Sequence, residues 1–130
     1  MATSIPDVLF SGETVVIDPA AGSVSRGKFY LENRKASVFQ AAVNVAWLEF
    51  GSGRQVLLSD LTVYDLDQGL PLNPERLSLG AQAVLPFEIA FADAAYKPAM
   101  GECTAVGLRL ESDGVLLEAL SPVEFAHRAG

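Results

Sequence analysis

The sequence predicts an antiparallel β-sandwich of seven to nine strands. Short apolar runs recur at regular spacing, separated by glycine, proline, asparagine and aspartate, which favour turns. No stretch has the apolar period of a helix longer than about three turns, which disfavours a sheet built with helical crossovers. A small closed barrel is the alternative architecture that the same pattern allows.

The stretch Ala42–Phe50 holds the only tryptophan and is expected to be the central strand. Val43, Val45 and Trp47 share one phase of a period-two pattern, so we expect the indole to lie in the middle of the core. Glu49 continues the same phase. The strand should therefore leave the core, or change register through a bulge, just after the indole.

Before this stretch, two short runs indicate a lead-in strand along a sheet edge, Val8–Phe10, and a second strand, Thr14–Ile17. Phe29 and Leu31 then alternate with polar neighbours, which is the pattern of a strand with one solvated face. The segment 33–37 is expected to turn the chain into the tryptophan strand.

After the tryptophan strand, Gln55–Leu58 and Leu61–Asp65 predict two more strands with a tight connection between them. The segment 67–74 predicts a loop that holds one helical turn. Asn73 is the expected N-cap and Pro74 the first helical residue, because proline lacks the N–H that this position leaves unpaired.

The last third of the chain predicts three strands. Ala83–Phe91 alternates most regularly, and Pro86, which has no N–H for a ladder, is expected at an edge or a bulge of the sheet. Two further runs, 104–111 and 115–125, flank Asp113–Gly114. This pair accepts the positive φ angles of a tight hairpin turn.

A chain of 130 residues fits one domain, 1–130, that is large enough to fold without disulfides or metal. The lone Cys103 has no internal partner, and the residues after Met1 show neither the basic nor the apolar region of a secretion signal. These features predict a cytoplasmic protein. No apolar run approaches the roughly 20 residues of a membrane-spanning helix, so no membrane insertion is expected.

The formal net charge is -7, and the acidic excess lies in the part of the chain after Arg54. Arg26, Lys28, Arg34 and Lys35 form a basic cluster, which we interpret as a solvated strand face and turn rather than an anion site. A nucleic-acid partner requires a basic patch that neutralises phosphates. We therefore expect no nucleic-acid partner.

Residues typical of catalytic sites are scarce. Nucleophilic catalysis needs a base beside the nucleophile, and the single histidine, His127, lies in the C-terminal tail. Cys103 is interpreted as a small residue at the start of a strand, because free cysteine usually behaves as a buried hydrophobe. Zinc sites use three or four ligands, and the chain has one cysteine and one histidine. We expect no catalytic residues, no metal, no cofactor and no enzyme activity.

Acidic residues leave two alternatives open. Asp65, Asp67 and Gly69 form a D-x-D-x-G segment of a kind that can hold calcium, but the third aspartate and the distal glutamate of a calcium loop are missing. We interpret it as a turn without tightly bound metal. Glu88 and Glu118 would form a carboxylate pair for glycoside chemistry only if the fold brought them together, and both are expected at outward strand positions.

Three segments follow one another in an order that known domains share. KFYLENRKA leads into the tryptophan strand, and NPERLSLGAQAVLPFEIAF and TAVGLRLESDGVLLEAL come after it. Over residues 14–125 this order resembles the immunoglobulin-like domains of the PapD-like and MSP type. The resemblance implies an immunoglobulin-like β-sandwich that binds proteins or acts as a structural module, with no shared catalytic residues. The chain departs from these domains in a longer segment 65–74, and from antibody domains in lacking a cysteine pair.

The expected function is therefore a non-catalytic protein–protein interaction or structural module. An intracellular protease inhibitor and a carbohydrate-binding module, both of similar fold, are the alternatives. A sugar-binding face would need exposed aromatic side chains, and Tyr30, Tyr64 and Tyr96 are the ones expected outside.

The last strand carries apolar residues on both faces. Leu116 and Leu120 fall in its outward phase, beside Ala105 and Gly107 of the neighbouring strand. Because contiguous exposed apolar surface usually marks an interface, we expect this face to bind a partner protein or a second copy of the chain, as a homodimer. The alternative is that the amino-terminal segment folds over these leucines within one molecule.

Overall fold

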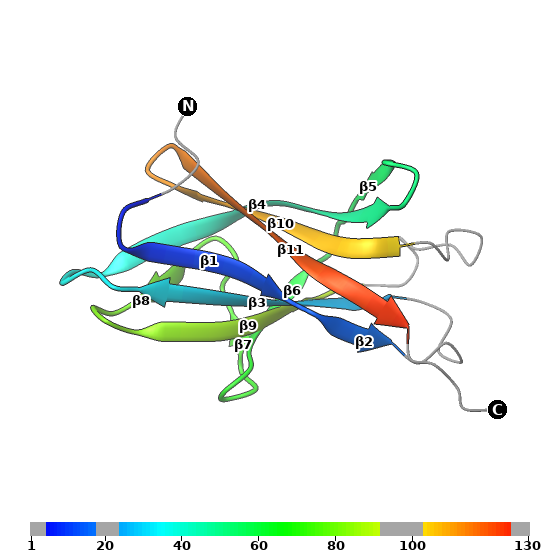
Figure 1. The fold of residues 1–130 in the computed structure, drawn as a ribbon. Coiled ribbons are helices and arrows are strands. Elements are labelled where there is room, and N and C mark those ends of the chain that lie inside the picture. Colours follow the sequence, from blue (N-terminus) through cyan, green and yellow to red (C-terminus); the bar gives the residue numbers. More distant parts are fainter. Residues whose placement is uncertain (1–4, 18–23, 92–102, 126–130) are drawn as a thin grey trace.

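The computed structural model describes residues 5–17, 24–91 and 103–125, which form eleven strands in two packed sheets (Figure 1). In chain order the strands are β1 (Val8–Glu13), β2 (Val15–Ile17), β3 (Arg26–Asn33), β4 (Phe39–Phe50), β5 (Gln55–Leu57), β6 (Thr62–Asp65), β7 (Pro71–Leu72), β8 (Leu77–Leu79), β9 (Val84–Ala90), β10 (Cys103–Ser112) and β11 (Val115–Phe125). Across these three ranges, no helix is long and apolar enough to cross a membrane. The expected β-sandwich is confirmed, and the short strands β7 and β8 come in addition to those expected.

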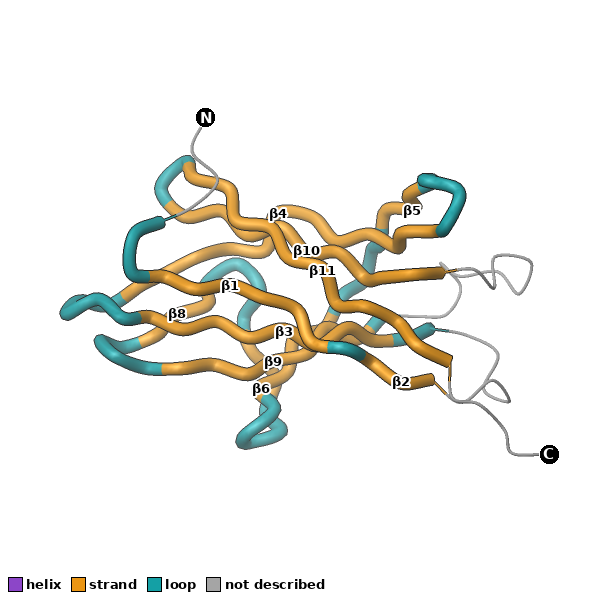
Figure 2. Tube along the Cα trace, in the orientation of Figure 1, coloured by secondary structure: helices purple, strands orange, loops and turns teal. Residues whose placement is uncertain are grey.

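The strands divide between a five-stranded and a six-stranded sheet. The first has the order β1–β3–β9–β6–β7, and the second β2–β11–β10–β4–β5, with β8 paired to the start of β4. Neighbours are antiparallel except β2 and β11, which run parallel. The chain changes sheets between β1 and β2, so the described N-terminal segment lies at the edges of both sheets (Figure 2).

The hydrophobic core lies between the sheets and takes side chains from both. Phe10, Phe29 and Phe87 pack together in the first sheet, with ring centroids 5.8 to 6.3 Å apart. The largest fully buried side chains include Phe29, Phe87, Leu31, Leu48, Leu77, Ile89, Leu108 and Leu110. Burial of these side chains is the main term that stabilises the fold.

A bulge in β4 changes the register of the central strand. Arg109 and Leu110 are adjacent in β10, but their partners in β4 are Val45 and Val43. Asn44 is therefore an extra residue in β4. Because side chains alternate along a strand, one extra residue sends every later side chain to the opposite face.

Trp47 consequently lies on the outer face of its sheet, and the prediction that it lies in the middle of the core is wrong. Its side chain is buried, with 6% of the residue exposed, but Ala46, Leu48 and Phe50 take the core positions. The bulge that changes the face of β4 lies before the indole. A second register shift does lie just after the indole, opposite Glu49 and Phe50, but its extra residue is in β10 and it does not turn β4 over. Glu49 therefore stays on the same face as the indole.

The predicted hairpin turn is confirmed, whereas the edge or bulge expected at Pro86 is present only as the end of a strand ladder. Asp113 and Gly114 have positive φ angles of 48° and 80° and join β10 to β11. β9 lies between β3 and β6 rather than at a sheet edge. Its ladder with β6 ends at Phe87, and at Pro86 only the backbone oxygen is bonded on that side, by Leu66 N at 3.0 Å, so no N–H is needed there.

The segment expected to hold a helical turn forms a β-turn between the strands β7 and β8. Asn73 Oδ1 accepts a hydrogen bond from Glu75 N at 3.0 Å, and the Asn73 backbone oxygen accepts one from Arg76 N at 3.0 Å. The expected cap by Asn73 is present, but no helix follows. Residues 77–79 pair with the start of β4 instead, and that pairing overrides the local helix signal.

Asn33, at the end of β3, is a fully buried polar residue. Its Nδ2 donates to the backbone oxygens of Ser37, Leu79 and Gly80 at 2.9, 3.3 and 3.0 Å, and its Oδ1 accepts from Lys35 N at 3.1 Å. This one amide ties the turn after β3 to the end of β8.

Candidate functional site

One row of four residues crosses the outer face of the six-stranded sheet. Leu57 of β5 pairs with Trp47 of β4. Gly107 of β10 pairs with Trp47 on one side and with Leu120 of β11 on the other. Paired residues of neighbouring strands point to the same face, so the indole lies between two leucines. Both leucines face solvent, with 70% of Leu57 and 44% of Leu120 exposed.

Gly107 lets the indole lie directly on β10. A Cβ atom at this position would stand 2.1 Å from Cε2 and 2.4 Å from Cζ2 of Trp47, far inside contact distance. Any other residue would therefore push the indole away from the sheet. The missing side chain at Gly107 explains how a tryptophan is buried on an outer face.

A carboxylate holds the nitrogen end of the indole. Glu49 Oε1 accepts hydrogen bonds from Trp47 Nε1 and from Gln55 Nε2, each at 3.0 Å. Thr104 Oγ1 donates to the backbone oxygen of Glu49 at 3.3 Å. The indole N–H thus has the partner that a buried tryptophan needs, and the carboxylate is fixed beside the ring.

An ion pair lies at the other end of the indole. Arg109 Nε donates to Glu118 Oε1 at 2.8 Å, and Arg109 Nη2 lies 2.6 Å from the same oxygen. The guanidinium carbon is 5.8 Å from the centroid of the Trp47 ring, within the range of a cation–π contact. Both charged side chains are partly exposed, so their effect is to position Arg109 over the indole rather than to stabilise the fold.

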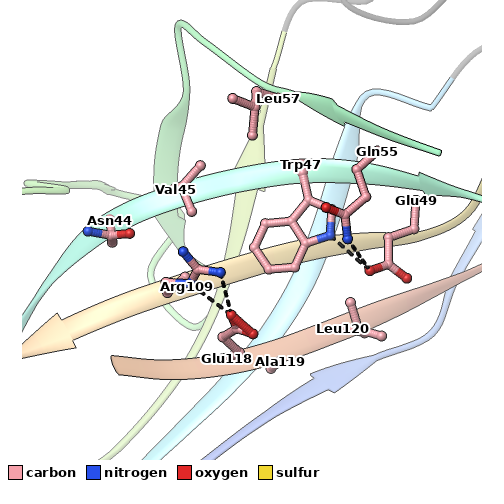
Figure 3. Close-up of a pocket in the computed structure, with 10 residues that line it drawn as sticks. All are labelled: Asn44, Val45, Trp47, Glu49, Gln55, Leu57, Arg109, Glu118, Ala119 and Leu120. Atoms are coloured by element: carbon pink, nitrogen blue, oxygen red, sulfur yellow. Dashed lines mark hydrogen bonds and ion pairs between the residues drawn. The ribbon is translucent and has the colours of Figure 1, made fainter. Parts of the chain in front are cut away.

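These groups line a hollow of about 710 Å³ on the outer side of β5, β4, β10 and β11. Figure 3 shows Trp47 at its centre, with Arg109 and Glu118 toward one end and Glu49 toward the other. The lining residues are Asn44, Val45, Trp47, Glu49, Gln55, Leu57, Arg109, Glu118, Ala119 and Leu120. We call this surface, defined by its lining residues, the Trp47 face.

Of the two leucines predicted to bind a partner, Leu120 lines the Trp47 face and Leu116 does not. Both lie on the outer side of β11, but Leu116 pairs with Glu111, two rows away from Gly107. The described N-terminal segment, 5–17, forms the edge strands β1 and β2 and leaves Leu120 exposed. That part of the segment therefore does not cover Leu120.

Of the residues that line the Trp47 face, only Leu120 was predicted as a site residue. Among those that sequence reasoning missed, Glu49, Leu57 and Arg109 matter most for its chemistry. For Glu49 and Arg109 a local signal existed. Glu49 stands two positions after Trp47, and Arg109 stands two positions after Gly107, so each points to the same face of the sheet as that residue. Leu57 had no such signal. It joins the site only because β5 pairs with β4.

The D-x-D-x-G segment forms a turn at the end of β6. Asp65 Oδ1 accepts from the backbone nitrogens of Asp67 and Gln68 at 2.8 and 3.3 Å, and Gly69 N donates to the backbone oxygen of Asp65 at 2.7 Å. In the part of the chain that the structure describes, no three His, Cys, Asp or Glu side chains gather as a metal site. The expected turn is present, and the lack of tightly bound calcium stays a prediction.

The other residues considered for chemistry are not brought together. Cys103 is 3% exposed at the start of β10, and burial raises the pKa of its thiol, which disfavours the reactive thiolate. Glu88 and Glu118 lie on the outer sides of different sheets and form no carboxylate pair. His127 and Tyr96 lie outside the described residues.

The basic cluster lies along β3 and the turn after it. Arg26 and Arg34 are exposed there, and Lys28 is half-buried. Arg34 donates a hydrogen bond to Glu32, and this bond holds the pKa of the Glu32 carboxyl below its ordinary value. Tyr30 donates to the same carboxylate at 3.1 Å. These contacts agree with a solvated strand face.

No protein-family model matches the chain, and no curated protein matches its sequence significantly. Among solved structures, a FixG-related protein from Vibrio parahaemolyticus aligns with a TM-score of 0.46 at 14% identity, over 95% of this chain and all of that one. The ASH/PapD-like domain 7 of human CEP192 aligns with a TM-score of 0.41 at 10% identity, over 93% of this chain and 87% of that one. At these identities and TM-scores the two likenesses carry no conclusion about the family or function of the chain. The strand pairing by itself shows an all-β sandwich of two sheets, as the sequence predicts.

Proposed function

We propose that the chain is a non-catalytic protein-binding module that binds its partner through the Trp47 face. The observation that carries this proposal is the exposure of Leu57 and Leu120, which flank a hollow on the outer face of the six-stranded sheet. A solvated sheet face is normally polar, whereas exposed aliphatic side chains around a concave surface are typical of protein interfaces.

The chemistry of the hollow supports a role without catalysis. Serine, cysteine, histidine and lysine serve as nucleophiles or bases in many enzymes, and none of them occurs among the lining residues in the described part of the chain. Its two carboxylates, Glu49 and Glu118, are each held by hydrogen-bond donors of the chain itself. The buried thiol of Cys103 lies elsewhere and lacks the exposure that a catalytic cysteine needs.

The covered indole favours a protein over a sugar as the ligand. Sugar-binding modules stack a sugar ring on an open aromatic face, but Arg109 lies over Trp47, which is only 6% exposed. Tyr30 and Tyr64 are half-buried and belong to the other sheet. A protease inhibitor would be one form of a protein-binding module, and the identity of the partner distinguishes it from a structural role.

Site-specific photo-cross-linking in the native host tests this function. A photoreactive phenylalanine analogue replaces Leu120 in one variant and Leu9 in the other; both positions are 44% exposed, but they lie on different sheets. We expect a discrete protein adduct from position 120 and none from position 9. The absence of an adduct at 120, or equal adducts at both positions, would contradict the proposal. A captured protease would indicate inhibition, and a filament or envelope component a structural role.

A further inference from the structure

We infer that the Trp47 face receives an extended segment of another protein, in which one basic side chain stands between two aliphatic side chains. The three side chains are at alternate positions, and the segment lies across the strands. This inference rests on the proposed function and adds the chemistry of the partner. Three properties of the face carry it: the spacing of its leucines, the unpaired charge in its hollow and its repulsion of a second copy.

The two exposed leucines have the spacing of alternate residues in an extended chain. Leu57 and Leu120 are three strand spacings apart in one row. With about 4.8 Å between neighbouring strands, the row is about 14 Å long. Residues i and i+4 of an extended chain are about 13 Å apart, and residue i+2 points to the same side. A segment across the strands can thus place aliphatic side chains against both leucines and a central side chain over the hollow.

Among the residues that the structure describes, one carboxylate of the hollow has no cationic partner. Arg109 and Glu118 neutralise each other, whereas Glu49 forms no ion pair among the residues described. The hydrogen-bond donors of Glu49, Trp47 and Gln55, are both neutral. A basic side chain placed over the hollow would supply the missing charge beside Glu49, and the flanking aliphatic contacts would shield that pair from water.

The charge of the face disfavours a second copy of the chain as the occupant. Among the described residues, the outer side of β4, β10 and β11 carries one arginine and four carboxylates, of which two line the Trp47 face and two lie beyond it. The carboxylates belong to Glu49, Glu111, Glu118 and Glu124. In a two-fold dimer the same face meets itself, so these carboxylates would oppose one another. The net charge of -7 on each chain adds to the repulsion.

Peptide titration followed by NMR tests the inference. The chain has a single tryptophan, so its indole N–H gives one signal from the middle of the face. Three capped peptides share the sequence Leu-Ser-X-Ser-Leu, where X is arginine, glutamine or glutamate. We expect the arginine peptide to shift the indole signal saturably and to bind at least about tenfold more tightly than the glutamate peptide. High salt should reduce this difference, because it screens charges near the surface.

Glu49→Gln removes the negative charge of the site but keeps its shape. Glutamine still has an oxygen that can accept the hydrogen bond from Trp47 Nε1. This variant should bind the arginine peptide about tenfold more weakly and the glutamine peptide as well as the wild type does. Glu88→Gln, at an outward position of the other sheet, is the matched control and should change neither affinity.

Equal affinity for the three peptides, or no shift of the indole signal at millimolar peptide, would overturn the inference. A photo-adduct from position 120 to a second copy of the chain would also overturn it. These results leave the protein-binding function in place, because they concern only what occupies the face. The function itself fails if position 120 gives no adduct at all.

Discussion

Trp47 is buried on the outer face of a sheet because three residues pack around its indole ring. Gly107 leaves room for the ring on β10, and the guanidinium carbon of Arg109 lies 5.8 Å from the centroid of the ring. Glu49 accepts the indole hydrogen bond. The contacts with Gly107 and Arg109 join β4 to β10, and the contact with Glu49 joins residues two positions apart on one face of β4. The environment of the indole therefore depends on the register of β4 against β10.

Gly107→Ala tests this arrangement. We expect it to destabilise the fold by about 1–3 kcal/mol, because the added methyl group displaces the indole, and to shift tryptophan emission to longer wavelength. Chemical denaturation and native-state fluorescence measure the two effects. In a Trp47→Leu background, the same glycine substitution should cost less than about 1 kcal/mol, since the clash is gone. An undiminished cost in that background would show that the clash is with something other than the indole.

Cys103 should behave as a buried structural residue. Its Sγ lies 3.5 Å from the backbone oxygen of Ala105, and burial raises the pKa of the thiol. We expect alkylation of the native protein to be slower than that of an unfolded thiol by at least on the order of 100-fold, and to speed up when denaturant unfolds the chain. Mass spectrometry after timed iodoacetamide treatment gives the rates. Rapid alkylation of the native protein would contradict the assigned burial.

At the scale of elements, the strands follow from sequence more reliably than their registers. The alternation around Phe29, Leu31 and Phe87 and the turn residues at 113–114 predict strands and a hairpin that the structure contains. The bulge at Asn44 could not be predicted, because the residues of β4 that follow it are apolar on both faces of the strand. Which phase enters the core is decided by the partner strand β10, far away in sequence.

The amide of Asn33 gives a sharp test of how β3, β4 and β8 are joined. Asn33→Ala leaves buried backbone carbonyls without their donor and should cost on the order of 3 kcal/mol. Asn33→Asp should cost at least as much, because a carboxylate would face the oxygens of Leu79 and Gly80. Urea denaturation measures both. An aspartate variant as stable as the wild type would show that the amide does not donate these bonds.

The turn at the end of β6 should have no strong affinity for calcium. Asp65 Oδ1 already accepts two backbone hydrogen bonds, so metal binding would compete with the contacts that form the turn. We expect millimolar calcium to leave the melting temperature unchanged in differential scanning calorimetry. A rise of several degrees that Asp67→Asn cancels would instead identify a calcium site.

At the scale of the molecule, only part of the Trp47 face could be predicted. Leu120 was identified from its outward phase in an unusually apolar strand. Leu57 joins it only through the pairing of β5 with β4. The period-two pattern places Glu49 with Trp47 and Arg109 with Gly107, but the face that these pairs occupy is set by strand alignment and by a bulge without a local signature. The site is thus a property of the assembled sheet, whereas the sandwich is already visible in the alternation of single strands.

We infer that the exposed leucines of the Trp47 face are available to a partner and are not part of the folding core. The stability of the Leu57→Glu/Leu120→Glu variant tests it most directly, with Leu108→Ala in the core as a control that should cost about 2–5 kcal/mol. We predict that the double variant unfolds within about 1 kcal/mol of the wild type, because exposed substitutions change stability little, and that both proteins are monomers by light scattering. A loss of several kcal/mol in the double variant would show that the chain itself covers these leucines, and would contradict the account.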